Sequence, residues 1–250
     1  MQLEGRVALV TGGGSGMGLS HCRELARRGA AVGVNDIADD ACRMVSQAIT
    51  LGGGKAVALP ADVTDRRQVE SIVESLAATF GGIDILVSNA GTIHADTGLL
   101  DTDEDDFWRT IKVNLGGCLN TSRACMPWLV KSPAPRIVVI GSTWGERGEG
   151  FGYGYVSAKG ALMAFARNLA KEFGPERVLV NVVSPGSVPT RMAAGWTPEM
   201  IAEDCKGIPL GRWAETQEIS NLVAYLASSE SSYLTGQTIS VNGGQVIRGM

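Results

Sequence analysis

Residues 7–29 read VALVTGGGSGMGLSHCRELARRG. An apolar, β-branched run is followed directly by a glycine-rich turn and then by a segment whose apolar residues have helical spacing. In a strand, turn and helix of this kind the backbone approaches a pyrophosphate closely, and the positive helix end points at it. We predict that this turn binds a dinucleotide, although a glycine cluster alone is also typical of an ordinary turn. The predicted contacts in the turn are Gly12, Ser15, Gly16, Met17 and Gly18.

The same alternation continues along the chain and predicts the fold. Apolar, β-branched runs recur at 30–36, 55–61, 83–90, 136–142, 177–186 and 236–244. Between them lie segments of helical spacing at 38–52, around 69–80, and at 103–130, 153–173 and 215–228. Parallel strands need long right-handed returns, so this order predicts an α/β fold. We expect a single-domain, doubly wound (Rossmann) parallel sheet of about seven strands with helices on both faces.

One stretch, 186–212, mixes Gly, Pro, Trp and charged residues without a clear period. In an open parallel sheet the ligand crevice lies beyond the carboxyl ends of the strands. A long irregular insert after the sixth strand is therefore expected to cover that crevice as a substrate lid. The whole of 1–250, with this lid included, is expected to be one dinucleotide-binding and catalytic domain.

Composition limits the possible function classes. The 250 residues are 44% hydrophobic and carry a net charge of −4, with no long Lys/Arg run, which argues against a nucleic-acid partner. The five cysteines are scattered without CxxC spacing, which fits reduced thiols in the cytoplasm better than disulfides or zinc, and we expect no metal. No window approaches the ~18 uncharged apolar residues of a membrane span, and no basic leader precedes an apolar stretch.

The ends of three strands predict the adenosine side of the crevice. Asp36 lies eighteen residues after Gly18, where a carboxylate accepts hydrogen bonds from a ribose and repels a 2′-phosphate. We therefore expect NAD rather than NADP, with a helix N-cap as the alternative role for Asp36. Further contacts are expected at the ends of the third and fourth strands, where ordinary loop chemistry is the alternative. They are Asp62, Val63, Asn89, Ala90 and Gly91.

Tyr155 and Lys159 are four residues apart on a helical segment and so share one face. A tyrosine that exchanges a proton near neutrality needs its pKa lowered from ~10 by ~2 to 3 units. A nearby Lys159 cation and a positive nicotinamide act in that direction. Tyr153 has only the uncharged Ser157 at the same spacing, which favours Tyr155; a solvated helix edge is the alternative. Ser142, at the end of the fifth strand, is expected to hydrogen-bond the substrate oxygen.

Over nearly its whole length the sequence resembles the short-chain dehydrogenase/reductase family, in its short single-domain branch. The family's ordered motifs match this chain: TGxxxGxG at 11–18, NNAG at 88–91, YxxxK at 155–159 and PGxxxT at 185–190. The family's serine, thirteen residues before the tyrosine, falls on Ser142. Ser88 replaces the first asparagine of NNAG, which affects the hydrogen bonds expected in that loop.

The resemblance implies an enzyme that interconverts a secondary alcohol and a ketone, acting on CH–OH groups with NAD as acceptor. It adds Asn114 as a fourth catalytic residue, holding a water that links the lysine to solvent; a core asparagine is the alternative. It implies that Lys159 also holds the nicotinamide ribose. The implied contacts of the nicotinamide end are Pro185, Gly186, Val188 and Thr190. Relatives commonly form homotetramers through the segments 103–130 and 153–173 and the last strand.

The substrate pocket is expected to be mainly apolar, although each of its residues also fits plain packing. The expected pocket residues are His94, Trp144, Tyr153, Met192 and Trp196. The glycine-rich stretch 145–150 is interpreted either as a lid or pocket wall or as a subunit contact.

Two other functions compete with this prediction. A 3-oxoacyl-carrier-protein reductase usually takes NADPH and needs basic residues near the lid; Asp36 and the few Lys/Arg of 191–212 argue against it. A non-catalytic dinucleotide-binding regulator has no use for the set of Asn114, Ser142, Tyr155 and Lys159.

Overall fold

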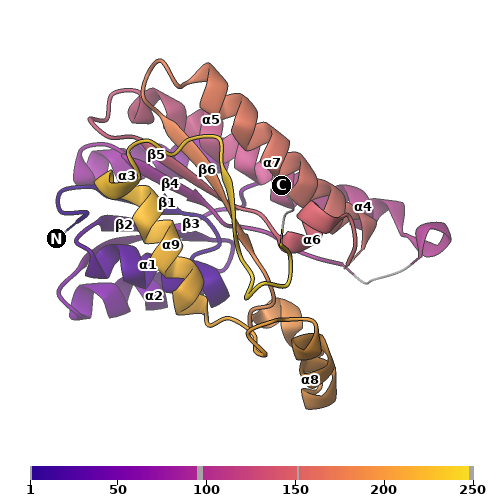
Figure 1. Cartoon of the computed structure of the whole chain (residues 1–250). Coiled ribbons are helices and arrows are strands. Elements are labelled where there is room, and N and C mark those ends of the chain that lie inside the picture. The colour runs from indigo at the N-terminus through magenta and orange to yellow at the C-terminus, as the bar shows by residue number, and fades with distance from the viewer. Residues whose placement is uncertain (1, 95–97, 151, 248–250) are drawn as a thin grey trace.

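The computed structural model of the chain describes residues 2–94, 98–150 and 152–247. Within them one parallel sheet has the strand order β3-β2-β1-β4-β5-β6-β7, which confirms the predicted doubly wound, single-domain fold (Figure 1). The strands are β1 (Val7–Val10), β2 (Ala31–Asp36), β3 (Lys55–Pro60), β4 (Ile85–Ser88), β5 (Arg136–Ile140), β6 (Leu179–Pro185) and β7 (Thr238–Val241).

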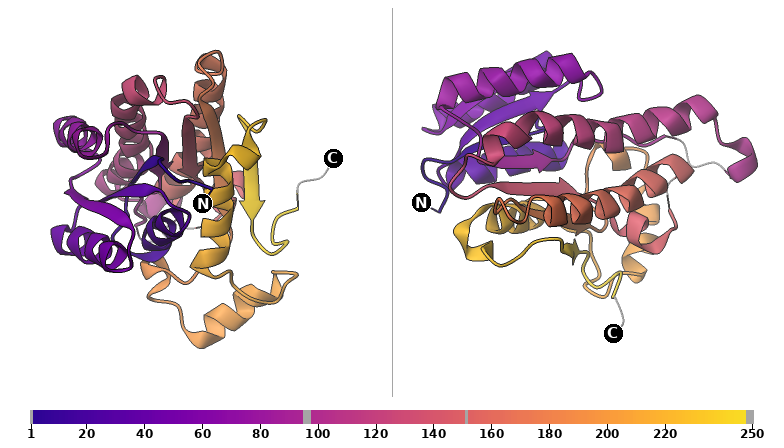
Figure 2. Two further views of the ribbon diagram at one scale, coloured as in Figure 1. Left: turned by 90° about the vertical axis from the view of Figure 1, so that its left-hand side faces the viewer. Right: turned by 90° about the horizontal axis from the view of Figure 1, so that it is seen from above.

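Helices cover both faces of this sheet (Figure 2). One face carries α1 (Gly16–Arg27), α2 (Asp39–Leu51) and α9 (Thr216–Ala227). The other carries α3 (Arg66–Phe80), α5 (Gly117–Leu129) and α7 (Tyr153–Glu172). The remaining helical elements are η1 (Leu99–Asp101), α4 (Glu104–Ile111), η2 (Lys112–Gly116), α6 (Thr143–Arg147), η3 (Arg191–Ala193), α8 (Pro198–Lys206) and η4 (Ser229–Ser231).

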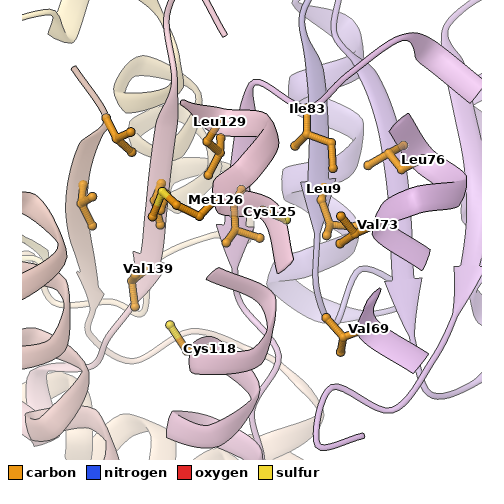
Figure 3. Close-up of a cluster of buried hydrophobic side chains, with 14 of the residues drawn as sticks. Leu9, Val69, Val73, Leu76, Ile83, Cys118, Cys125, Met126, Leu129 and Val139 are labelled. Atoms are coloured by element: carbon orange, nitrogen blue, oxygen red, sulfur yellow. The ribbon is translucent and has the colours of Figure 1, made fainter. Parts of the chain in front are cut away.

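The central strands are buried on both faces, so their sequences are continuously apolar. In β1, Val7 and Leu9 belong to the core under α3, α5 and α7, whereas Ala8 and Val10 belong to the core under α1, α2 and α9. This alternation follows from the two-residue period of a strand. In Figure 3, Leu9 lies beside Val73 of α3 in the first of these cores.

The segment predicted as one helix over 103–130 is interrupted in the structure. Helix α4 passes into a π-helical turn, η2, before α5 begins. The buried side chain of Asn114 explains the break, because its Nδ2 donates to Thr110 O at 2.9 Å and to Thr92 O at 2.8 Å. Thr110 O is the carbonyl that a regular helix offers to the backbone N–H of Asn114, so the side chain competes with the helix for it.

The stretch 186–212 contains more regular structure than its sequence suggested. It includes η3 and the helix α8, whose first turn is capped by Thr197 Oγ1 accepting from Met200 N at 3.3 Å. No residue of α8 is fully buried, and the helix extends away from the body of the sheet (Figure 1). A helix of nine residues with so little buried surface has a weak apolar period, which explains why it was missed.

The order of the strands fixes where a ligand can bind. The chain moves outward from β1 in one direction through β2 and β3, and in the other direction from β4 onward. The loops after β1 and β4 therefore diverge at the carboxyl edge of the sheet and leave a crevice between them. No helix in the described part of the chain is long and apolar enough to cross a bilayer.

A buried histidine joins α1 to α9. His21 is fully buried, and its Nδ1 lies 2.8 Å from Ser220 Oγ, which in turn donates to Ser20 Oγ at 2.8 Å. Its Nε2 has no hydrogen-bond partner among the described residues. Burial lowers the pKa of His21 to about 3, so the folded protein holds it neutral.

This histidine predicts a pH dependence of stability. Unfolded His21 takes up a proton below about pH 6.5 while the folded form does not, so stability falls as pH falls from 6.5 toward 3. Between pH 7 and pH 5 the loss is about 2 kcal/mol. In urea unfolding at pH 5, 6 and 7, His21→Leu should remove about that much of the pH dependence. An unchanged slope in the variant would contradict this account. Glu24 and Glu218 have their pKa values lowered to about 2, mainly by their hydrogen bonds with Arg27 and Arg212, and they act only below this range.

Candidate active site

The turn after β1 requires glycine at the positions that the sequence singled out. Gly12 and Gly16 have φ angles of +62° and +51°, a region that side chains other than glycine rarely adopt. At Gly18 the constraint is space, because a Cβ there would lie 1.9 Å from Gly12 O. The backbone thus folds back on itself where helix α1 begins, as a pyrophosphate-binding turn requires.

The loops after β1 and β4 are joined by side chains. Thr11 Oγ1 accepts from Asn89 N and Ala90 N, both at 3.0 Å. Asn89 Nδ2 donates to Thr11 O at 2.9 Å and to Gly12 O at 3.2 Å. The predicted contacts Asn89 and Ala90 therefore lie directly against the glycine turn. Thr11 is part of the same hydrogen-bonded contact between the two loops, although the sequence argument did not include it among the cofactor contacts.

Asp36 ends β2 beside the same turn. Its Oδ2 accepts from Gly14 N at 3.0 Å and its Oδ1 from Ala38 N at 3.1 Å. The N-cap of α2 is Ala38, so the alternative role of Asp36 as that N-cap is wrong. The carboxylate instead lies next to the glycine turn, where the predicted ribose contact requires it.

The end of β3 makes ordinary loop contacts. Asp62 Oδ1 accepts from Thr64 N at 2.8 Å, and Val63 O accepts from Asn120 Nδ2 at 2.9 Å. Both residues follow β3, two strands from β1 at the same carboxyl edge. Their contact with an adenine remains a prediction.

These features fit a dinucleotide. Ser15, the N-cap of α1, makes no side-chain hydrogen bond to the first turn, so its N–H groups are not capped by a side chain. A Cβ at Gly14 would lie 2.9 Å from Asp36 Oδ2, so only a glycine lets the turn pass this carboxylate. A Cβ at Gly16 would lie 3.5 Å from Thr190, so the loop after β6 reaches the turn as well.

Three of the predicted catalytic side chains converge at the end of β5. Ser142 is buried at the N-terminus of α6 and hydrogen-bonds the buried Tyr155. Lys159 Nζ lies 5.5 Å from the centre of the Tyr155 ring and donates to Ile140 O at 2.8 Å. The carbonyl at the end of β5 thus fixes the lysine one helical turn from the tyrosine.

Burial, rather than the lysine charge, dominates the ionisation of this group. Burial raises the pKa of Tyr155 to about 12, and the hydrogen bond with Ser142 opposes that rise. Burial also lowers the pKa of Lys159 to about 8. The expectation that Lys159 lowers the tyrosine pKa is therefore wrong for the protein's own groups, because it omitted the lost hydration of a buried phenolate. A phenol in this state remains protonated at neutral pH.

Asn114 is the fourth member of the group. It is buried, and its Oδ1 has no hydrogen-bond partner among the described residues. A Cβ on Gly91 would lie 2.6 Å from Asn114 Oδ1 and 3.7 Å from Lys159 Nζ, so the asparagine and the lysine flank this glycine. The structure therefore brings all four predicted catalytic residues together around the loop after β4.

A cleft in front of Tyr155 contains ten of the predicted site residues. The predicted residues that line it are Met17, Ser142, Trp144, Tyr155, Pro185, Gly186, Val188, Thr190, Met192 and Trp196. None of the described residues that line the cleft carries a formal charge. The part of the chain that the structure describes also contains no group of three or more His, Cys, Asp or Glu side chains placed to hold a metal ion.

Two predicted pocket residues do not line this cleft. Tyr153 begins α7 and its side chain is 47% exposed, whereas Tyr155 is buried in the cleft. His94 Nδ1 lies 2.9 Å from Thr110 Oγ1, and the ring packs near Gly154. The packing alternative therefore describes His94 better than substrate contact, whereas substrate contact by the half-exposed Tyr153 remains a prediction.

Sequence reasoning missed several residues of the cleft. Ile93, Ser187, Ala193 and Trp213 line it as well. Trp213 stacks edge to face on Trp196, with ring centres 5.3 Å apart. Trp213 lies one residue after the predicted lid. A large aromatic residue next to an irregular stretch is the sequence feature that could have identified it as a pocket residue.

The stretch 145–150 packs against its own chain. A Cβ at Gly150 would lie 2.6 Å from Trp144, and a Cβ at Gly145 would lie 2.7 Å from Lys159 Cβ. Glu146 Oε1 accepts from Ser240 Oγ of β7 at 2.8 Å. This geometry favours the interpretation of the stretch as the wall of the pocket behind Trp144.

Comparison with known proteins gives matches over nearly the whole chain. The family described as "Enoyl-(Acyl carrier protein) reductase" matches residues 12–245. The 3-oxoacyl-[acyl-carrier-protein] reductase FabG of Escherichia coli is 37% identical over 244 residues, 98% of each chain. FabG of Thermotoga maritima is 36% identical over 249 residues, 99% of this chain and 100% of that one. A crystal structure of a short-chain type dehydrogenase/reductase from Mycobacterium marinum has a TM-score of 0.92 at 32% identity, covering 99% of this chain and 98% of that one.

The glycine turn provides a test of the site. In Gly18→Ala the new methyl group meets the carbonyl of Gly12, so the turn must open. We expect a loss of stability of about 2 to 3 kcal/mol and at least about tenfold weaker binding of dinucleotide, measured by thermal unfolding and by fluorescence titration with NADH. Gly98→Ala is the control, because a Cβ there meets nothing within 4 Å and φ is −61°. Equal dinucleotide affinity in the two variants would refute the close turn.

Proposed function

The chain belongs to the short-chain dehydrogenase/reductase family and is an oxidoreductase, and from this premise we propose that it interconverts a secondary alcohol and a ketone with NAD(H). The observation that carries the proposal is the buried Tyr155 hydroxyl. It is hydrogen-bonded to Ser142 and lies in an uncharged cleft beside a lysine. A protonated phenol in that position suits proton donation to an oxygen, as in carbonyl reduction.

The glycine turn, Asp36 and the loop after β6 would hold the dinucleotide. When bound, a nicotinamide gives a hydride to, or takes one from, the carbon that bears the substrate oxygen. Tyr155 gives its hydroxyl proton to the ketone oxygen during reduction and takes it back from the alcohol during oxidation. Ser142 hydrogen-bonds the same oxygen and orients it toward Tyr155. Ile140 O fixes Lys159, and Asn114 lies beside it. In the proposed reaction, these two residues relay the proton between Tyr155 and the solvent near the loop after β4.

The location of Asp36 supports NAD over NADP. Its carboxylate lies against the N–H of Gly14, where the ribose 2′ position of an adenosine is expected. A 2′-phosphate there meets a negative charge at close range. This preference belongs to the proposal, as do the roles of the individual site residues.

A second candidate function has a specific observation in its favour. The FabG proteins, at 35–37% identity, are named as reductases of 3-oxoacyl groups on a carrier protein. The uncharged cleft accepts an acyl chain as well as a small ketone. Against this candidate, two of the three basic residues within 186–212 are already paired: Lys206 with Glu203 at 2.5 Å and Arg212 with Glu218 at 2.7 Å. Few free cations are left there for an acidic carrier.

The assembly proposed for the chain is a homotetramer. A groove between α5 and α7 is lined by apolar side chains, including Leu119, Met126, Phe165 and Leu169. These helices are the two that the sequence argument assigned to subunit contacts, and the groove supports that assignment. A cytoplasmic location also remains a prediction; the five cysteines are all free thiols, in keeping with it.

The choice of cofactor is tested through the charge of Asp36. Fluorescence titration should give a Kd for NADH at least about tenfold below that for NADPH, because only NADPH meets the carboxylate. Asp36→Asn retains an acceptor for the Gly14 N–H and removes the charge, so it should tighten NADPH binding with little change for NADH. Tighter binding of NADPH by the unaltered protein would overturn the proposed preference.

The reaction itself is tested by two tyrosine variants. Tyr155→Phe should lower kcat for ketone reduction by about 10² to 10⁴-fold, because the proton donor is lost, while the Kd for NADH stays within about twofold. Tyr153→Phe is the matched control, and its kcat should be unchanged. The probes are 2-octanone, cyclohexanone, 1-tetralone and the acetoacetyl thioester of N-acetylcysteamine. Undiminished turnover in Tyr155→Phe excludes the proposed mechanism, and turnover of the thioester alone favours the carrier-protein candidate.

A further inference from the structure

Helix α8 carries an acidic residue on the face that it turns toward the protein. Ile201, Asp204 and Cys205 are its half-buried residues, whereas most of its other positions are exposed. Their spacing places them on one side of the helix. Because none of the three is fully buried, apolar contact holds this helix only weakly.

The carboxylate of Asp204 joins three separate segments to α8. Its Oδ2 accepts from Ser187 Oγ and from Trp213 Nε1, both at 2.7 Å. Its Oδ1 accepts from Gln245 Nε2 at 3.5 Å, which is a long contact. Two short hydrogen bonds to an ionised acceptor are strong ones. They connect α8 to the loop after β6 and to the residues that lead into α9.

Both donors of the short hydrogen bonds belong to the cleft. Ser187 and Trp213 line it, and Trp213 stacks on Trp196, which lines it too. Ser187 O also accepts from Ala214 N at 3.0 Å, so the two donor segments are already adjacent. Asp204 itself is absent from the lining, and therefore any effect that it has on a ligand passes through these neighbours.

We infer that Asp204 is a positioning residue: its carboxylate fixes the indole of Trp213 and the carboxyl end of α8, and so sets the width of the substrate end of the cleft. The part of this inference that concerns substrate affinity rests on the proposed function. The tether divides the predicted lid into two parts. Asp204 holds the start of the predicted lid 186–212 at Ser187 and its end from 204 onward, so movement of the lid is confined to the residues between, which include Met192 and Trp196.

The first test needs no substrate. In Asp204→Asn, which is close in size, a neutral amide oxygen replaces the charged acceptor of both short hydrogen bonds, and the NH2 group faces Gln245 Nε2. The two short hydrogen bonds therefore weaken, and α8 should loosen. Hydrogen exchange of the backbone amides of 198–206, measured by mass spectrometry, should be about tenfold faster. Glu203→Gln is the matched control: it removes a neighbouring carboxylate that pairs with Lys206 at the surface, and exchange should not change. Equal exchange in the wild type and Asp204→Asn would overturn the inference.

The second test separates positioning from general stability. With the ketone that the unaltered enzyme reduces best among the four probes, Asp204→Asn should raise KM about tenfold, leaving kcat and the Kd for NADH within about twofold. In a Trp213→Phe background, which lacks the indole N–H, the same substitution should have a clearly smaller effect on KM. Faster exchange with unchanged KM, or additive effects of the two substitutions, would overturn the positioning role. If no probe is reduced by the wild type, the proposed function fails, and exchange alone decides whether Asp204 holds α8.

Discussion

The contact between Thr11 and the loop after β4 is the constraint on which both ends of the cleft depend. One hydroxyl oxygen accepts from two successive N–H groups, and the Asn89 amide returns two hydrogen bonds to the glycine turn. The strands β1 and β4 are neighbours at the centre of the sheet, but their loops leave it in opposite directions. Joining them by side chains holds the glycine turn at a fixed distance from Gly91, and both Asn114 Oδ1 and Lys159 Nζ lie next to Gly91. The dinucleotide end and the proton-transfer end are therefore parts of one rigid edge.

Burial shifts the pKa values of the two ionisable groups of this edge in opposite directions. It disfavours the phenolate of Tyr155 and the ammonium of Lys159 alike, so both groups are driven toward their neutral forms. Ser142 is the group that favours the tyrosine anion within the protein itself. A positive nicotinamide adds to that effect in the oxidising direction, in the proposed reaction. In the protein alone, Tyr155 therefore carries the proton that the proposed reduction would transfer.

The sequence predicted the sheet because strand and helix periods are local properties. In β1, every residue is apolar, which indicates directly that both of its faces are buried. The sequence also predicted the positions of Gly12, Gly16 and Gly18, since a glycine requirement follows from the tight turn. It did not predict the π-helical turn at Asn114, where one side chain competes for a backbone carbonyl, because that competition depends on Thr92 from a distant loop. Nor did it predict the role of Asp204, whose partners Ser187 and Trp213 are separated from it by seventeen and nine residues. The pKa of Tyr155 was misjudged for the same reason, since burial is a property of the whole fold.

The comparisons establish the family but leave its substrate open, and the structure gives a physical reason. The family description names an enoyl reductase, the FabG proteins are 3-oxoacyl reductases, and all of these matches span nearly the whole chain. Similarity over nearly the whole chain therefore accompanies different named reactions. The part of the cleft that the sheet constrains least in this chain is the segment after β6. This segment contributes Ser187, Met192, Trp196 and Trp213 to the lining. The lining of the cleft is uncharged, so in the proposed reaction selection among ketones depends on shape. By the inference above, that shape depends on how firmly Asp204 holds α8 and Trp213.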